Sequence, residues 1–355
     1  MFQLNAETAK AAVYGGWFLG GGGGGRPADG LRVGQQALEA GTVTVMELSD
    51  FADGATVMTA ALVGSPAADK GGVGPAHCRR VMELFEANGG TEIAAIIANE
   101  AGGQSITNGW LAAASCGIPM LDAACNGRAH PTGVMGAMHL DTVPGYRSLQ
   151  AAAGGAGECA VELFASGSID AASKLVREAA NQCGGFVTVL RNPAPMSFVR
   201  ENCAVGALSQ CIEVGRLLLK HENRPEEMLR GLQELLDCRE IGRGVTHDFR
   251  LETRGGFDVG SVLIGENAPL EVTFWNEYMT AERDDARIAT FPDLIMLLDS
   301  RTGLPLCSAA LQDGLDVIAV TVPKDRLLLS TTMADERILK PCETAVCKEI
   351  LRYLK

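Results

Sequence analysis

Several side chains that can move protons or bind polar groups lie close together between residues 122 and 130. Asp122 ends a short apolar run, and Asn126, Arg128 and His130 follow it with little apolar sequence between them. Carboxylates and histidine act as acids or bases, whereas an amide or a planar guanidinium binds carbonyl and carboxylate oxygens. This spacing predicts a site for a small polar molecule.

Glu100 is a second acidic candidate, because it also follows a predicted strand and precedes small residues that leave room for a ligand. Polar groups at strand ends lie where α/β folds bind ligands. We therefore predict Glu100, Asp122 and His130 as catalytic, with the carboxylates activating or positioning water. The competing interpretation is that the carboxylates cap the next helix or turn, Arg128 forms a structural ion pair and His130 fills space.

An uninterrupted run of six glycines extends from Gly20 to Gly25. It matches neither the dinucleotide fingerprint nor the P-loop, but its backbone N–H groups can surround an anion or a polar ring. We predict substrate contacts from Gly22, Gly23 and Gly24 and from Gly103. The alternative is a flexible connector.

Two other chemistries receive weaker support. Cys125, five residues before His130, suggests a covalent mechanism, but the chain has eleven cysteines and most of them are expected to be inert. Asp122, Cys125, His130 and His139 form no standard zinc pattern. The sequence thus requires no cofactor, and a divalent metal is a minority hypothesis.

The elements that must position these residues indicate an α/β fold with a mostly parallel or mixed sheet, because strands alternate with helices over residues 1–238. Short strand-like runs separated by Gly and Pro then predict an all-β domain at 239–330. Residues 331–355 are predicted to form a helical tail, with a helix at Glu343–Leu354, that returns to the first domain. The main helices predicted earlier in the chain are Ala6–Leu19, Leu31–Ala40, Pro75–Asn88, Ile106–Ser115, Ile169–Asn181 and Cys203–His221.

The bulk composition excludes several classes of function. With 355 residues and a net charge of −13, the chain has no basic stripe for nucleic acid. We see no apolar run approaching the ~18 residues of a membrane span, and no secretory signal. These features predict a cytoplasmic protein with reduced thiols. Small-residue helices such as Ile106–Ser115 allow close helix contacts and make a homo-oligomer plausible.

Six motifs occur in the order found in one known family, between about Ala6 and about Pro323. They are Leu19–Gly25, Gly64-Ser65-Pro66, Glu100-Ala101-Gly102-Gly103, Asp122-Ala123 with Gly127-Arg128-Ala129-His130-Pro131, Gly256-Phe257-Asp258-Val259-Gly260, and Asn276-Glu277 with Pro292-Asp293-Leu294-Ile295. On these residues the chain resembles the S-methyl thiohydantoin desulfurase family, proteins associated with hydantoinases and oxoprolinases. The resemblance implies an α/β domain followed by a β-rich domain.

The resemblance also implies a reaction: hydrolysis at C2 of a thiohydantoin-like ring, which expels a thiol or sulfide and leaves a hydantoin. Asn276 and Glu277 would join the substrate site if the β-rich domain folds over the α/β crevice. The chain departs from the family pattern at Arg26, Ala124, His130 and Thr132, which indicates a divergent member with its own small-molecule substrate. The alternative is a non-catalytic partner of a hydantoinase or oxoprolinase.

Overall fold

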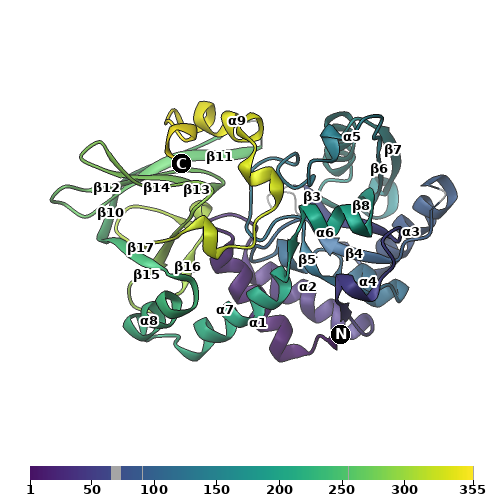
Figure 1. Ribbon diagram of the computed structural model, residues 1–355, viewed down its shortest axis with the longest axis horizontal. Coiled ribbons are helices and arrows are strands. Elements are labelled where there is room, and N and C mark those ends of the chain that lie inside the picture. Colours follow the sequence, from purple (N-terminus) through teal and green to yellow (C-terminus); the bar gives the residue numbers. More distant parts are fainter. Residues whose placement is uncertain (65–72, 90, 255, 355) are drawn as a thin grey trace.

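The protein consists of two lobes that lie side by side along its longest axis (Figure 1). The computed structural model describes residues 1–64, 73–89, 91–254 and 256–354. Ser65 and Pro66 of the predicted turn lie outside these described residues. The first lobe holds a mixed sheet with helices, and the second holds an antiparallel sheet, so the predicted fold class is confirmed.

The sheet of the first lobe has nine strands within the described ranges, in the order β1-β2-β5-β4-β3-β8-β6-β7, with β9 paired to β5. The neighbours β2, β5, β4 and β3 run parallel, whereas β8, β6 and β7 are antiparallel. The parallel strands direct their carboxyl ends, and therefore the loops after β4 and β5, to one edge. The bounds are β1 Phe2–Gln3, β2 Thr44–Met46, β3 Thr56–Gly64, β4 Ala95–Ala98, β5 Met120–Ala124, β6 Ser148–Gly154, β7 Val161–Gly167, β8 Phe186–Pro195 and β9 Ala204–Val205.

The helices of the first lobe include α1 at Ala6–Leu19, with the predicted bounds. A Cβ atom at Gly15 would lie 1.8 Å from the carbonyl oxygen of Cys211, and one at Gly215 would lie 1.7 Å from that of Ala11. Glycine at both positions therefore lets α1 and α7 pack with their backbones in contact, which fixes the direction in which α1 enters the glycine run. The other bounds are α2 Pro27–Ala40, α3 Pro75–Gly89, α4 Trp110–Cys116, α5 Ile169–Gln182, α6 Met196–Asn202 and α7 Ala207–Lys220.

Helix α4 starts later than predicted. Ser105–Thr107 forms a separate 3-10 turn, and Gly109 adopts a left-handed conformation with φ +96° before the helix begins at Trp110. Its buried side chains belong to the core that α2 and α3 share, so the small residues of this helix are used inside the chain. They supply no separate argument for a homo-oligomer, which stays a prediction.

The second lobe is built on eight antiparallel strands within the described residues, in the order β14-β13-β12-β11-β10-β17-β15-β16. Helix α8, Pro225–Leu236, precedes this sheet. The bounds are β10 Arg239–Arg254, β11 Phe257–Ile264, β12 Leu270–Trp275, β13 Glu277–Arg283, β14 Ala286–Thr290, β15 Leu294–Asp299, β16 Pro305–Leu306 and β17 Asp316–Val322.

The helix predicted at Glu343–Leu354 is wrong in position, because α9 runs from Glu336 to Val346 with Pro341 inside it. The side chain of Asp335 accepts a hydrogen bond from the backbone of Arg337 and caps the helix. α9 packs against β11 and β12 of the second lobe (Figure 1). The segment before it contacts the first lobe, so the tail touches both lobes and the domain limits stay predictions.

Candidate active site

The glycine run lies where the two lobes meet and is fixed by both. The second lobe donates to it from the backbone N–H of Tyr278, 2.7 Å from the Gly21 oxygen, and of Ser308, 3.0 Å from the Gly22 oxygen. The first lobe donates from the backbone N–H of Ser105, 3.0 Å from the Gly24 oxygen. Because these hydrogen bonds fix the backbone of the run to both lobes, they do not fit the alternative of a flexible connector.

Two residues of the run are partly accessible to solvent. Gly23 and Gly24 are half-buried and Gly25 is exposed, whereas Gly22 is buried. Gly103 packs against the end of the run, since a Cβ atom there would lie 2.8 Å from the Gly25 oxygen. The glycines therefore provide a surface without side chains beside the buried groups described next.

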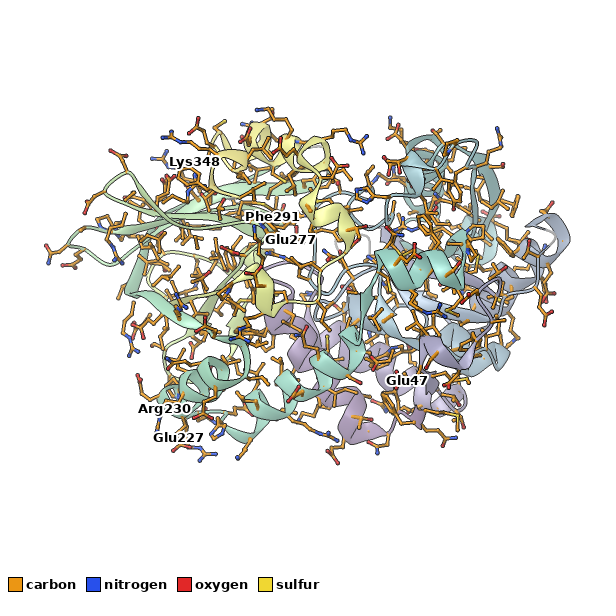
Figure 2. The ribbon with its side chains drawn as sticks, in the orientation of Figure 1. Glu47, Glu227, Arg230, Glu277, Phe291 and Lys348 are labelled. Carbon is orange, nitrogen blue, oxygen red and sulfur yellow. The ribbon has the colours of Figure 1, made fainter. Side chains whose placement is uncertain are left out.

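Glu277 faces the glycine run. A Cβ atom at Gly23 would lie 1.9 Å from its Oε1, and its Oε2 has no hydrogen-bond partner within the described structure. Only 2% of the residue is exposed. Burial, together with the nearby charge of Glu100, holds the pKa of Glu277 well above its usual range, although Arg128 opposes the shift. Figure 2 shows Glu277 and Phe291 in the middle of the molecule.

Arg128 crosses from the first lobe to the second. Its Nη1 donates to the carbonyl oxygens of Pro292 at 2.8 Å and Asp293 at 2.7 Å, and its guanidinium lies 4.4 Å from the centre of the Phe291 ring. The residue is fully buried, and Nη2 has no partner in the described part of the chain. Burial lowers the pKa of Arg128, but a guanidinium keeps its proton at physiological pH.

His130 and Glu100 form a buried pair. Nε2 of His130 lies 3.3 Å from Oε2 of Glu100, which also accepts from the backbone N–H of His130 at 3.3 Å. Neither ring nitrogen makes a well-aligned hydrogen bond to the residues that the structure describes. Burial lowers the pKa of His130, and the carboxylate of Glu100 only partly opposes this. The imidazole is therefore neutral near pH 7.

Asp122 differs from His130, because both of its side-chain oxygens accept well-formed hydrogen bonds. Its Oδ1 accepts from the backbone N–H of Ser209 at 2.9 Å, and its Oδ2 accepts from the Ser209 hydroxyl at 2.6 Å. These bonds satisfy the first turn of α7, which is the capping role weighed against catalysis above. With both oxygens engaged, Asp122 is better explained as a structural cap, and the proposal below does not use it.

The two asparagines mainly hold backbone segments. Oδ1 of Asn126 accepts from the Ser330 N–H at 3.1 Å, while its buried Nδ2 has no partner among the described residues. Asn276 has φ +57°, and its Oδ1 accepts from the Asp258 N–H at 2.9 Å, so it fixes the turn that presents Glu277. Asn126 therefore keeps a donor for a ligand, and Asn276 acts on the site through Glu277.

Two further buried residues, Arg191 and Ser105, are not among those predicted from the sequence. Arg191 on β8 is 8% exposed, and its Nε has no partner within the described ranges. Ser105 is buried beside Gly24, and its Oγ is likewise unpartnered there. The signal for Arg191 was an arginine directly after the apolar strand residues 186–190, where a buried charge needs a partner or a ligand. Ser105 gave no such signal.

The weaker chemistries find little support. Cys125 is buried, lies 3.1 Å from the hydroxyl of Thr59, and burial raises the pKa of its thiol to about 11, so the thiolate is scarce at pH 7. Within residues 1–64, 73–89, 91–254 and 256–354, no three His, Cys, Asp or Glu side chains are grouped as metal ligands. In the same ranges, no helix has the length and apolarity needed to traverse a bilayer.

The four departures from the family pattern occupy different environments. The Arg26 side chain is exposed and pairs with Asp29 at 2.9 Å, whereas Ala124 is fully buried among alanines and leaves no room for an acid. Thr132 is half-buried near His130. Of these four residues, only His130 is one of the buried polar residues of the candidate site.

Comparisons with known proteins agree with this architecture. Residues 7–160 match the model described as "S-Me-THD-like, N-terminal domain", and residues 168–336 match "S-Me-THD-like, C-terminal domain". A crystal structure of a protein from Chromobacterium violaceum superposes with a TM-score of 0.75 at 19% identity, covering 97% of this chain and 96% of that one. This likeness shows the fold alone. The chain matches no curated protein.

Proposed function

The chain belongs to the S-Me-THD-like family, and from that premise and the buried group we propose that it is a hydrolase of thiohydantoin-type five-membered rings. Water would attack C2, the C2–S bond would break, and a thiol would leave with a proton while the ring becomes a hydantoin. The substrate is a small molecule. Cytoplasmic localisation, a homo-oligomer and a hydantoinase or oxoprolinase partner stay predictions.

One observation carries this proposal: four buried side chains from both lobes keep polar atoms that have no partner among the described residues. These atoms are Oε2 of Glu277, Nη2 of Arg128, Nδ2 of Asn126 and Nδ1 of His130. Buried polar atoms are normally paired, because an unpaired one costs about 1–3 kcal/mol. Glu277 and Arg128 also lie against the glycine run, at Gly23 and Gly21, and such a group of buried unpaired atoms is typical of a site that a polar ligand completes.

The protonation states suit hydrolysis. The neutral imidazole of His130 can take a proton from water, and Glu100, 3.3 Å from Nε2, stabilises the imidazolium that forms. The raised pKa of Glu277 keeps its carboxyl protonated, so it can give a proton to the leaving sulfur. Arg128 and the asparagine amide then donate to the negative charge that develops on the ring.

The test is release of methanethiol from an S-methyl thiohydantoin by the purified wild type, Glu277→Gln and His130→Phe. Glu277→Gln removes the acid and His130→Phe removes the base, so each is expected to lower kcat by about 10²- to 10⁴-fold. Glu266→Gln, in an exposed turn of the second lobe, is the matched control and keeps wild-type activity.

A folded wild type that releases no thiol from S-methylated or free thiohydantoins, but copurifies with a co-expressed hydantoinase, would instead support the non-catalytic partner. Equal activity of wild type and Glu277→Gln would remove Glu277 from the reaction while leaving a hydrolase in place.

A further inference from the structure

A cavity lies on the opposite side of the first sheet from Arg191 and Thr59. It is about 70 Å³ in volume and lies between α2, α3, α4 and the strands β3 and β8. Leu62 and Thr188 are paired across β3 and β8 and face the cavity. Thr59 and Arg191 are also paired, three positions along each strand, so they point to the other face of the sheet. Nothing in the proposed hydrolysis uses this space.

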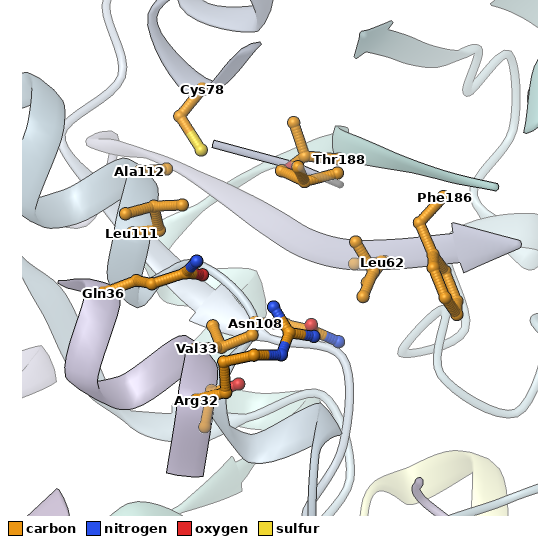
Figure 3. Close-up of a pocket in the computed structure, with 14 residues that line it drawn as sticks. Arg32, Val33, Gln36, Leu62, Cys78, Asn108, Leu111, Ala112, Phe186 and Thr188 are labelled. Carbon is orange, nitrogen blue, oxygen red and sulfur yellow. The ribbon is translucent and has the colours of Figure 1, made fainter. Parts of the chain in front are cut away.

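The cavity has an apolar wall and a polar end. Val33, Leu62, Leu111 and Phe186 supply apolar surface (Figure 3). The guanidinium of Arg32 has a single weak ion pair in the described structure, 3.4 Å from Asp29, and 55% of its side chain is exposed. Arg32 is therefore free to bind an anion at the cavity.

Two amides complete the polar end. Gln36, one turn after Arg32 on α2, has a buried Oε1 without a partner in the described residues, and this oxygen accepts a donor. Asn108 donates its Nδ2 to Oδ1 of Asn99 at 2.7 Å and leaves its own carbonyl oxygen at the cavity. Figure 3 shows the polar ends of Arg32, Gln36 and Asn108 directed into the space between α2 and β3.

We propose that this cavity binds a small carboxylic acid that carries an N–H donor, such as a short N-acylated amino acid. The carboxylate would pair with Arg32, the N–H would donate to Gln36, and a short apolar group would enter between Leu62 and Leu111. Asn108 is hydrogen-bonded to Asn99, the residue before Glu100. A ligand in contact with Asn108 would therefore be linked to the segment that carries the candidate active site. The proposal does not depend on the hydrolase assignment.

Isothermal titration with N-acetylglycine tests this, with N-acetylglycinamide as the neutral probe. The wild type is expected to bind the acid at least about tenfold more tightly than the amide, because only the acid pairs with Arg32. Arg32→Gln should remove this preference, and Ala112→Leu, which fills the cavity from α4, should abolish binding of both probes. Arg230→Gln, an exposed arginine on α8 (Figure 2), is the matched control and should bind as the wild type does.

Thermal unfolding of each variant shows whether it is folded, so a loss of binding is attributed only to a folded variant. The proposal is overturned if the folded wild type binds neither probe at concentrations of about 10 mM, since a Kd of this size corresponds to a ΔG° of only about −2.7 kcal/mol. Binding that survives both Arg32→Gln and Ala112→Leu would also overturn it, because the ligand would then lie elsewhere.

Discussion

At the scale of single residues, the candidate site is costly to the folded protein. Glu277 and Arg128 are buried with atoms that have no partner within the described structure, and Glu100 adds a second carboxylate nearby. Functional sites commonly contain groups that lower stability, so replacing them can stabilise a protein while removing its activity. A gain in stability together with a loss of activity on substitution therefore distinguishes a functional carboxylate from a structural one.

Glu277→Gln is expected to raise Tm at pH 7 while it removes activity. The unfolded chain ionises Glu277 near 4.5, whereas the folded chain holds its proton to higher pH. Stability is therefore lost progressively as the pH rises from about 4.5 to the folded pKa, because over this range only the unfolded chain gives up the proton. Differential scanning calorimetry from pH 4 to pH 8 should show the stability difference between variant and wild type growing with pH. A variant less stable than wild type at every pH would contradict this.

His130→Phe is expected to make the protein less sensitive to mild acid. The pKa of His130 is lower in the folded protein than its ordinary 6.5, so the unfolded chain takes up the proton first. Wild-type stability from this residue is thus present above 6.5 and is lost as the pH falls through the folded pKa. Chemical denaturation at pH 7.5 and pH 5 measures it. The loss between these pH values should be smaller for the variant, and an equal loss would refute the buried neutral histidine.

At the scale of elements, the helices and strands that position the site could be predicted from the sequence better than the contacts within the site. The bounds of α1 and the strand-rich character of residues 239–330 followed from periodicity and turn residues. The contacts of Gly23 with Glu277, and of Asp122 with Ser209, did not follow from these patterns, because they join residues far apart in the chain. Glu277 itself entered the set only through the family resemblance.

Gly23→Ala tests the contact between the glycine run and the site. Gly23 does not have the left-handed φ of its neighbours Gly22 and Gly24, so the effect of a methyl group is steric: it would lie 1.9 Å from Oε1 of Glu277. We expect a loss of about 1–3 kcal/mol in unfolding free energy and a displaced carboxyl that lowers activity. Gly54→Ala, where no atom of the described ranges lies within 4 Å of an added Cβ, is the control. Wild-type activity in Gly23→Ala would show that the run does not position Glu277.

At the scale of the whole molecule, Arg128 connects the lobes, because its guanidinium donates to two carbonyl oxygens of the second lobe from a loop of the first. The segment at Ser330 adds further bonds between the tail and Asn126. The site therefore exists only when both lobes are in contact, which explains why neither family domain alone contains all of its residues.

Arg128→Lys is expected to weaken the contact between the lobes. Lysine keeps the charge, but its side chain is one bond shorter than that of arginine and lacks the flat guanidinium that lies over Phe291, so about 1.5–3 kcal/mol of unfolding free energy should be lost with each missing bond. Calorimetry should show a lower Tm and a broader transition than wild type. An unchanged transition would mean that other contacts hold the lobes together.

The most direct test of the account is a crystal structure of the protein with a hydantoin, the predicted product, bound at saturation. The account predicts the ring beside Gly23 and Gly24, with hydrogen bonds to Oε2 of Glu277 and Nη2 of Arg128, which have no partner among the residues that the structure describes. A hydantoin bound elsewhere, with ordered water alone on those atoms, would contradict the central claim that the buried group is a substrate site.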